Sequence, residues 1–160
     1  PTGWGFSLQN RGHNFSLNPA HPNALAPDKR PYHTIIPALI TRAEDGALIA
    51  SFGVMGGFMQ PQGHLQVVTA LADDGLDTQA ALDRPRFCIE DGTAGGRVAL
   101  EDGIAAGVKK KLAEMGHPVR RVSGHERGIF GRGQVILREP GTGVLWAGSD
   151  PRADGCAMSY

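Results

Sequence analysis

The feature that most constrains this chain is a glycine-rich segment, residues 51–64, which stands between a strand pattern and a helix pattern. The apolar residues 47–50 predict a strand, and residues 64–71 predict a helix. A strand that stops at Gly56-Gly57 and turns into a helix leaves backbone N–H groups at one spot, where the helix N-terminus adds partial positive charge. Such a spot suits an anion, or an oxyanion formed during a reaction. A tight turn without a chemical role is the alternative that the pattern alone leaves open.

The composition predicts a single globular domain over residues 1–160, since 41% of the residues are hydrophobic. The 16 Lys and Arg residues balance the 16 Asp and Glu residues. This balance argues against nucleic acid as a partner. No apolar stretch approaches the length of a membrane span, so no membrane partner is expected. The 23 glycines and 11 prolines predict a turn-rich fold with shaped loops.

The residues that commonly carry catalysis form no recognisable motif. Cys88 and Cys156 lie far apart and make neither a metal pattern nor a disulfide framework. No two histidines stand at a convincing ligand spacing, and there is no nucleophile elbow, phosphate loop or zinc helix signature. We therefore expect no metal site. The two unpaired cysteines favour a cytoplasmic location, with a periplasmic or secreted protein as the alternative.

The predicted elements run as strands, then helices, then strands, which is typical of an α+β fold. Residues 11–31 predict a long polar loop stiffened by Xaa-Pro pairs, and residues 33–40 predict a buried strand. The helix at 103–115 shows an apolar face of Ile104, Val108, Leu112 and Met115. The full prediction is strands at 5–10, 33–40, 47–52, 86–89, 97–100, 119–122, 133–139 and 144–148, with helices at 61–72, 77–83 and 103–115.

Five short motifs occur in a fixed order, and together they resemble a known family. They are Asn14-Phe15-Ser16, residues 23–31, Gly56-Gly57, Arg84-Pro85-Arg86-Phe87 and Ser149-Asp150-Pro151-Arg152. Read for itself, the last motif predicts a turn with a local Asp–Arg pair. In register, the five resemble the C-terminal, small subunit of the γ-glutamyltranspeptidase family of N-terminal-nucleophile hydrolases. The resemblance covers nearly the whole chain and implies a four-layer αββα sandwich built from both subunits, incomplete in this chain.

The resemblance also implies a mechanism that needs neither a metal nor an organic cofactor. Members of this family are made as a proenzyme that cleaves itself before a threonine, which becomes the N-terminus of the small subunit. The threonine hydroxyl attacks a γ-glutamyl amide, its own α-amine serves as the base, and water or an acceptor amine releases the acyl group. That threonine is expected some tens of residues before Pro1. The chain alone is therefore expected to be inactive, and its expected partner is the N-terminal large subunit of the same precursor.

Site residues follow from the resemblance position by position. Gly56 and Gly57 match the glycines whose N–H groups bind the oxyanion. Arg11 and Asn14 match a loop that holds the α-amino group of the glutamyl substrate, where the family usually has an acidic residue at the position of Asn14. Here the carboxylate is gone and a cation is added, so a ligand ammonium would lose its ion partner and meet like charge.

His33 and Thr34 stand where the family carries two serines that bind the substrate α-carboxylate, and both can still donate hydrogen bonds. A buried structural role for His33, and ordinary loop polarity for Arg11 and Asn14, are the alternatives. The predicted function is part of an autoprocessing γ-glutamyltransferase-like amidohydrolase or acyltransferase that cleaves γ-glutamyl or glutaryl-type amides. The alternative is a scaffold without a nucleophile that binds small carboxylates or serves as an interaction module.

Overall fold

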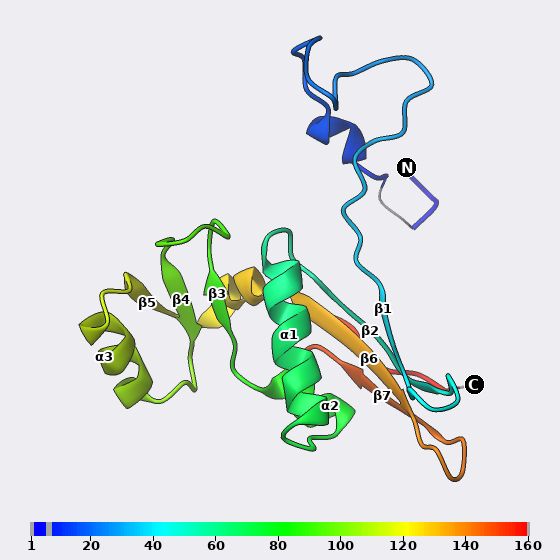
Figure 1. Ribbon diagram of the computed structural model, residues 1–160, viewed down its shortest axis with the longest axis vertical. Helices are drawn as coiled ribbons and strands as arrows, with labels where there is room; N and C mark the ends of the chain where they lie inside the picture. Colours follow the sequence, from blue (N-terminus) through cyan, green and yellow to red (C-terminus); the bar gives the residue numbers. More distant parts are fainter. Residues whose placement is uncertain (1, 6–7, 160) are drawn as a thin grey trace. The chain divides into compact units, whose positions relative to one another are not determined.

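The computed structural model describes residues 2–5 and 8–159, which form two compact units, Pro1–Ile35 and Ile36–Tyr160. Figure 1 draws both units, and a single domain over the whole chain stays a prediction. The predicted strand at 5–10 lies partly outside the described residues, and residues 8–10 have no regular secondary structure.

The N-terminal unit consists of turns and extended segments, as the proline pattern predicted. A 3-10 helix, η1 (Arg11–Asn14), is followed by a loop closed by one parallel bridge between Ser16 and Ala24. The Ser16 N–H donates to the Asn23 carbonyl at 2.9 Å, and the Leu25 N–H donates to the Ser16 carbonyl at 3.0 Å. These bonds give the loop a defined path without a hydrophobic core.

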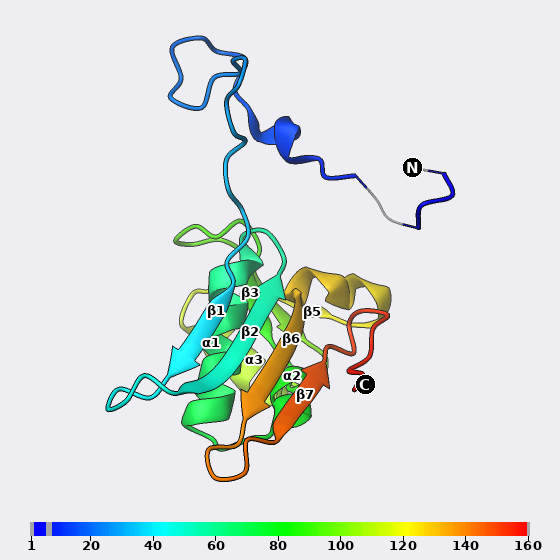
Figure 2. The ribbon, with the colours of Figure 1, turned by 90° about the vertical axis from the view of Figure 1, so that its right-hand side faces the viewer.

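The second unit is built on a four-stranded antiparallel sheet in the order β1-β2-β6-β7 (Figure 2). Its strands are β1 (Ala38–Thr41), β2 (Leu48–Met55), β6 (Arg132–Arg138) and β7 (Leu145–Ser149). Side chains alternate across a strand, so Phe52, Val54 and Val135 point into one core. The hairpin of β6 and β7 confirms the pair predicted at 133–139 and 144–148.

The predicted buried strand at 33–40 is wrong in its extent and burial. Only Ala38–Thr41 pairs with β2, and Ile35 and Ile36 are 58% and 46% exposed. Pro37 has no N–H to give to a ladder. The Ile36 carbonyl oxygen lies 2.8 Å from His64 Nε2 on the neighbouring helix instead of entering the sheet.

Two helices, α1 (Met59–Ala72) and α2 (Thr78–Asp83), cover the inner face of this sheet. Val67 of α1 and Leu82 of α2 complete the core around the inward strand residues. The close approach of α1 requires Gly63, because a Cβ there would lie 2.7 Å from Val54 Cγ1. Both helices match their predicted ranges, and Asp77 caps α2 by accepting from the Ala80 N–H at 2.8 Å.

A second, three-stranded sheet follows in the order β3-β4-β5. It contains β3 (Phe87–Ile89), β4 (Val98–Glu101) and β5 (Val119–Val122), with a 3-10 helix, η2 (Gly124–Phe130), after β5. Strands β4 and β5 are parallel and are joined through α3 (Ala106–Glu114), a βαβ unit within an otherwise antiparallel α+β fold. A second core joins this sheet to α1 through Met59, Cys88, Ala99, Val122 and Phe130.

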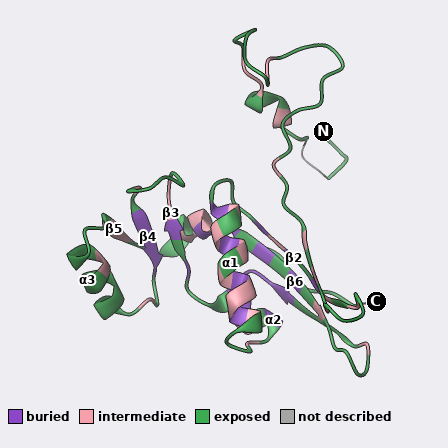
Figure 3. Cartoon of the chain, in the orientation of Figure 1, coloured by how far each residue is buried: buried purple, intermediate pink, exposed green. Residues whose placement is uncertain are grey.

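The predicted apolar face of the helix at 103–115 is only partly covered. Ile104 and Leu112 are half-buried, whereas Val108 and Met115 are 46% and 68% exposed. Figure 3 shows burial concentrated on the strands and α1, while α3 is mostly exposed. Among the described residues, no helix has the length and apolar character needed to cross a membrane.

Candidate active site

The Gly56-Gly57 turn lies where β2 ends and α1 begins, as the sequence predicted. The Gly56 and Gly57 carbonyls accept from the Met59 and Gln60 N–H groups, each at 3.1 Å, which starts the helix. Both glycines are exposed, and within the described residues neither glycine N–H donates to another group of the protein. Two backbone donors at a helix N-terminus are therefore available to an anion.

The turn requires glycine for two separate reasons. Gly57 has a φ of 60°, which residues with a Cβ rarely adopt. At Gly56, with φ 156°, an added Cβ would lie 3.1 Å from the Gly131 Cα and 3.1 Å from the Met59 Cβ. The close approach of the Gly131 backbone thus fixes the shape of the turn.

The four predicted acyl-site residues belong to the N-terminal unit. Arg11 donates to Thr34 Oγ1 in a short hydrogen bond and to Gln9 Oε1 at 3.2 Å, so the structure brings Arg11 and Thr34 together. Asn14 and His33 are exposed. Within the N-terminal unit taken by itself, His33 is therefore not buried. A common site of these four residues with Gly56 and Gly57 stays a prediction.

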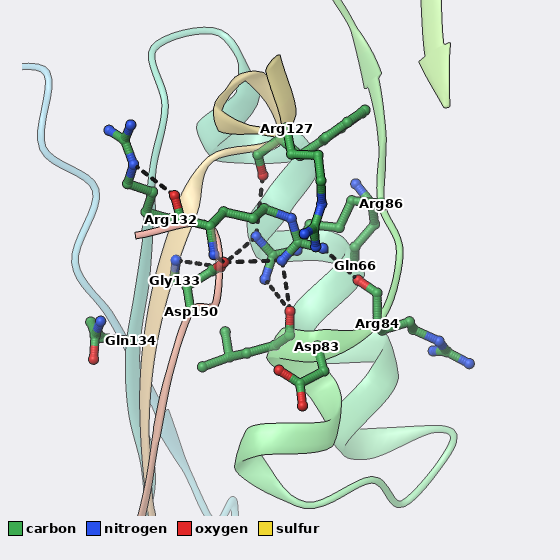
Figure 4. A network of polar contacts seen from close by, with 12 residues as sticks. Gln66, Asp83, Arg84, Arg86, Arg127, Arg132, Gly133, Gln134 and Asp150 are labelled. Carbon is green, nitrogen blue, oxygen red and sulfur yellow. Dashed lines mark hydrogen bonds and ion pairs between the residues drawn. The ribbon is translucent and has the colours of Figure 1, made fainter. Parts of the chain in front are cut away.

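The motifs at 84–87 and 149–152 meet in a buried ion cluster (Figure 4). Arg86 Nη1 lies 2.8 Å from Asp150 Oδ2, and these side chains are 2% and 0% exposed. Asp150 Oδ1 lies 3.0 Å from Arg152 Nη1, which confirms the local Asp–Arg pair. The Gly133 N–H also donates to Asp150 Oδ2 at 2.7 Å, tying β6 to the end of β7.

The sequence did not predict two members of this cluster, Arg127 in η2 and Glu101 at the end of β4. Glu101 Oε2 accepts from the Arg86 backbone N–H at 2.8 Å and from Arg152 Nη2 at 2.5 Å. Its Oε1 accepts from Arg127 Nε at 2.6 Å and from Arg152 Nε at 2.9 Å. The one signal in the sequence is that Glu101 directly follows the apolar strand residues 98–100, which suggests that its carboxylate is buried. A buried carboxylate needs cationic partners.

The two buried arginines also satisfy the end of α2. Arg86 Nη2 and Arg152 Nη1 donate to the Leu82 carbonyl at 3.2 Å and 2.8 Å, and Arg152 Nη2 donates to the Arg84 carbonyl at 2.9 Å. Cations at a helix C-terminus compensate its unpaired carbonyls and its partial negative charge. The cluster therefore joins α2, both sheets and η2, and its role is structural.

The acid–base properties support that role. Burial alone would raise the pKa of Glu101, but hydrogen bonds from Arg152 and Arg127 outweigh burial and hold the pKa below its usual value. Burial likewise raises the pKa of Asp150, but the Arg86 charge and the hydrogen bonds from the Arg152 and Gly133 backbone N–H groups outweigh burial, so this pKa is also held below its usual value. Burial raises the pKa of the Cys88 thiol, which makes Cys88 a poor nucleophile at neutral pH.

Lower pH is expected to destabilise the fold through this cluster. A carboxyl group with a lowered folded pKa adds stability above its unfolded pKa, about 3.9 for Asp and 4.3 for Glu. That stability is lost as the pH falls through the folded pKa. Thermal unfolding of the full-length protein from pH 7 to pH 3 should show a falling midpoint below about pH 4, with a shallower slope in Glu101→Gln than in wild type. The exposed-pair variant Asp45→Asn should keep the wild-type slope; equal slopes in all three proteins would contradict the assignment.

Metal chemistry finds no support in the described part of the chain. Among residues 2–5 and 8–159, no group of three or more His, Cys, Asp or Glu side chains is arranged to hold a metal ion.

Comparison with known proteins identifies the family. The sequence model described as gamma-glutamyltranspeptidase matches residues 1–160, so the chain belongs to the γ-glutamyltranspeptidase family. The chain is 36% identical, over 98% of its length, to the oxamate amidohydrolase proenzyme of Klebsiella pneumoniae, and covers 29% of that protein. It is 33% identical, over 96% of its length, to the glutathione hydrolase-like YwrD proenzyme of Bacillus subtilis, again covering 29%.

A solved structure agrees with this result. The crystal structure of cephalosporin acylase from Bacillus halodurans superposes with a TM-score of 0.80 at 48% identity, covering 98% of this chain and 28% of the acylase. The family consists of autoprocessing hydrolases and acylases, and this chain spans less than a third of the length of these relatives. The predicted α+β content is confirmed by the helices and strands of the chain and by its superposition on this acylase.

Proposed function

We propose that this chain supplies the oxyanion hole of an autoprocessing amidohydrolase or acyltransferase. The observation that carries the proposal is the exposed Gly56-Gly57 turn, whose N–H groups stand without partners among the described residues at the start of α1. Donors fixed in this way before the reaction stabilise charge as it develops on the substrate oxygen. Family membership supplies the chemistry in which such a charge forms.

In the proposed reaction, a threonine from a segment outside these 160 residues attacks the amide carbonyl. The threonine α-amine accepts the hydroxyl proton, and the carbonyl oxygen becomes an oxyanion held by the Gly56 and Gly57 N–H groups. The C–N bond then breaks, and the leaving amine takes the proton. Water or an acceptor amine attacks the resulting ester, the same two donors hold the second oxyanion, and the threonine is restored.

The acyl group is proposed to be bound by Arg11, Asn14, His33 and Thr34. Arg11 and Thr34 already share a hydrogen bond, and together they offer a cation and a hydroxyl to a carboxylate. None of these four side chains is a carboxylate, so none can form an ion pair with the α-ammonium of a γ-glutamyl substrate. Relatives named for oxamate and for cephalosporins support an acyl group outside the γ-glutamyl class, whereas a relative named for glutathione supports that class. We propose the glutaryl-type amide because it has no α-ammonium that would need a carboxylate.

Substrate preference tests this acyl site directly. The processed full-length enzyme is expected to show a kcat/KM about tenfold higher or more for a glutaryl amide than for the γ-glutamyl amide with the same leaving group. A difference of about 1.4 kcal/mol, which like charge near Arg11 readily produces in a partly buried site, is enough for this ratio. The double variant Arg11→Gln, Asn14→Asp should move the preference toward the γ-glutamyl amide. A clear preference of the wild type for the γ-glutamyl amide would defeat the assignment.

The open face of the large sheet supports a large-subunit partner. Leu39, Ser51, Ile136 and Ala147 stand in one row across β1, β2, β6 and β7. Leu39 and Ile136 are 69% and 45% exposed in the unit 36–160. We propose that a second sheet, from the large subunit of the same precursor, packs on this face and completes the four-layer αββα sandwich.

Autoprocessing is tested by intact mass and N-terminal sequencing of the full-length gene product. Two chains are expected, the shorter one starting with threonine and containing all 160 residues. A single uncleaved chain without amidase activity would instead favour the inactive scaffold that binds small carboxylates.

A further inference from the structure

Two glutamines of α1 bond to the free edge of β3. Gln62 Oε1 accepts from the Ile89 N–H at 2.7 Å, and Gln62 Nε2 donates to the Ile89 carbonyl at 3.1 Å. Gln66 repeats the arrangement with the Phe87 N–H at 2.9 Å and the Phe87 carbonyl at 3.1 Å. Each side-chain amide thus takes the place that a residue of a neighbouring strand would take.

The pairing is possible because Gln62 and Gln66 on α1 are spaced almost as far apart as Phe87 and Ile89 on β3. Four residues of an α-helix rise about 6 Å, and two residues of a strand advance about 6.7 Å. Strand β3 is the edge of the order β3-β4-β5, so its alternate residues Phe87 and Ile89 present N–H and C=O groups away from β4. Backbone groups left without partners there would cost free energy, and the two glutamines therefore fix α1 against β3.

The third hydrogen bond distinguishes the two glutamines. Gln62 Nε2 also donates to the Phe58 carbonyl at 3.1 Å, whereas Gln66 Nε2 donates to the Gln62 carbonyl at 3.0 Å. Phe58 directly follows Gly57 and precedes the first residue of α1. Of this pair, Gln62 connects the glycine turn to the small sheet, and Gln66 connects only the helix.

We infer that Gln62 is a positioning residue for the oxyanion hole. It ties the carbonyl of Phe58, the residue after Gly57, to Ile89 and so fixes where the Gly56 and Gly57 N–H groups point. This inference rests on the proposed function, because it assigns a purpose to the fixed geometry of the turn. The Gln62 side chain bonds to backbone groups of both Phe58 and Ile89, so it affects the reaction through the geometry of the turn. A displacement of about 1 Å at a reacting centre can cost about 10²-fold in rate.

Matched variants in the processed full-length enzyme test the role. Gln62→Met and Gln66→Met each remove two bonds to β3 and one bond to the backbone carbonyl four positions earlier, and both should lower the thermal midpoint similarly. Only Gln62→Met is expected to lower kcat by about 10- to 100-fold, with KM within about twofold of wild type. Gln66→Met should keep kcat within about threefold. Equal kcat losses in the two variants, or an unchanged kcat in Gln62→Met, would overturn the inference.

The variant Gln62→Glu covers the case in which Gln62→Met does not fold. Its carboxylate can still accept from the Ile89 N–H but has no N–H for the Phe58 carbonyl, so kcat should fall as in Gln62→Met. A wild-type kcat in Gln62→Glu would show that the bond to Phe58 has no positioning role.

Amide hydrogen exchange separates this inference from the oxyanion assignment. The Met59 and Gln60 N–H groups bond to the Gly56 and Gly57 carbonyls, so they should exchange faster in Gln62→Met or Gln62→Glu than in Gln66→Met. Unchanged exchange overturns the positioning role even where the oxyanion hole is confirmed. Faster exchange, combined with normal turnover after loss of the Gly57 donor, overturns the oxyanion hole while the link from Gln62 to the turn stands.

Discussion

Replacing Gly57 with proline in the full-length enzyme is expected to lower turnover by about 10²- to 10³-fold, the usual cost of one oxyanion donor. Proline removes the N–H, and its ring cannot adopt the φ of 60° found at Gly57. The loss should fall mainly on kcat, because the donor binds a charge that is present only during the reaction. Steady-state kinetics on the processed variant measures it.

Gly57→Ala is the matched control for this variant. Alanine keeps the N–H, and its Cβ would meet no heavy atom within 4 Å at this position. Its cost is the positive φ, about 1–2 kcal/mol, so turnover should stay within about tenfold of wild type. A folded and processed Gly57→Pro enzyme with turnover equal to that of Gly57→Ala would contradict the oxyanion role.

Loss of the Arg86 guanidinium is expected to have the largest effect on stability. Arg86→Met would leave Asp150 buried without its 2.8 Å partner, and breaking a buried ion pair from one side costs about 3–5 kcal/mol. The Leu82 and Phe130 carbonyls would lose hydrogen bonds as well. Denaturant unfolding of the full-length protein should show a correspondingly lower midpoint.

Arg84→Met is the control for Arg86→Met. Arg84 pairs with Asp74 at 2.5 Å, but these side chains are 42% and 46% exposed. Exposed pairs contribute about 0–1 kcal/mol. Arg86→Lys keeps the charge but not the forked donors, so it should fall between the two and is measurable where Arg86→Met does not fold. Equal losses in Arg84→Met and Arg86→Met would show that burial does not govern the cluster.

Elements with local signals could be predicted from the sequence. The range of α1 follows from Pro61 in its first turn and from Gly75, whose φ of 65° lets the Leu76 N–H reach back to the Ala70 carbonyl at 2.9 Å. The Gly56-Gly57 turn was equally readable, because a strand pattern and a helix pattern meet there. These predictions needed only neighbours within a few positions along the chain.

Features set by distant partners could not be predicted. Glu101 finds Arg127 and Arg152, which lie 26 and 51 positions away, so nothing near Glu101 shows that it is buried and paired. The parallel pairing of β4 with β5 also depends on a crossover through α3, which no local pattern specifies. Residues 33–37 read as a buried strand from their apolar side chains, but strand pairing needs a partner, and β2 pairs with β1 only from Ala38 onward.

The most direct test of the account is a crystal structure of the processed full-length enzyme with a tetrahedral analogue, such as a boronate with a glutaryl-type chain, bound to the threonine. We predict that one oxygen of the analogue lies about 2.7–3.1 Å from the backbone nitrogens of Gly56 and Gly57. An analogue oxygen bonded to other groups, with both glycine N–H groups left facing solvent, would contradict it.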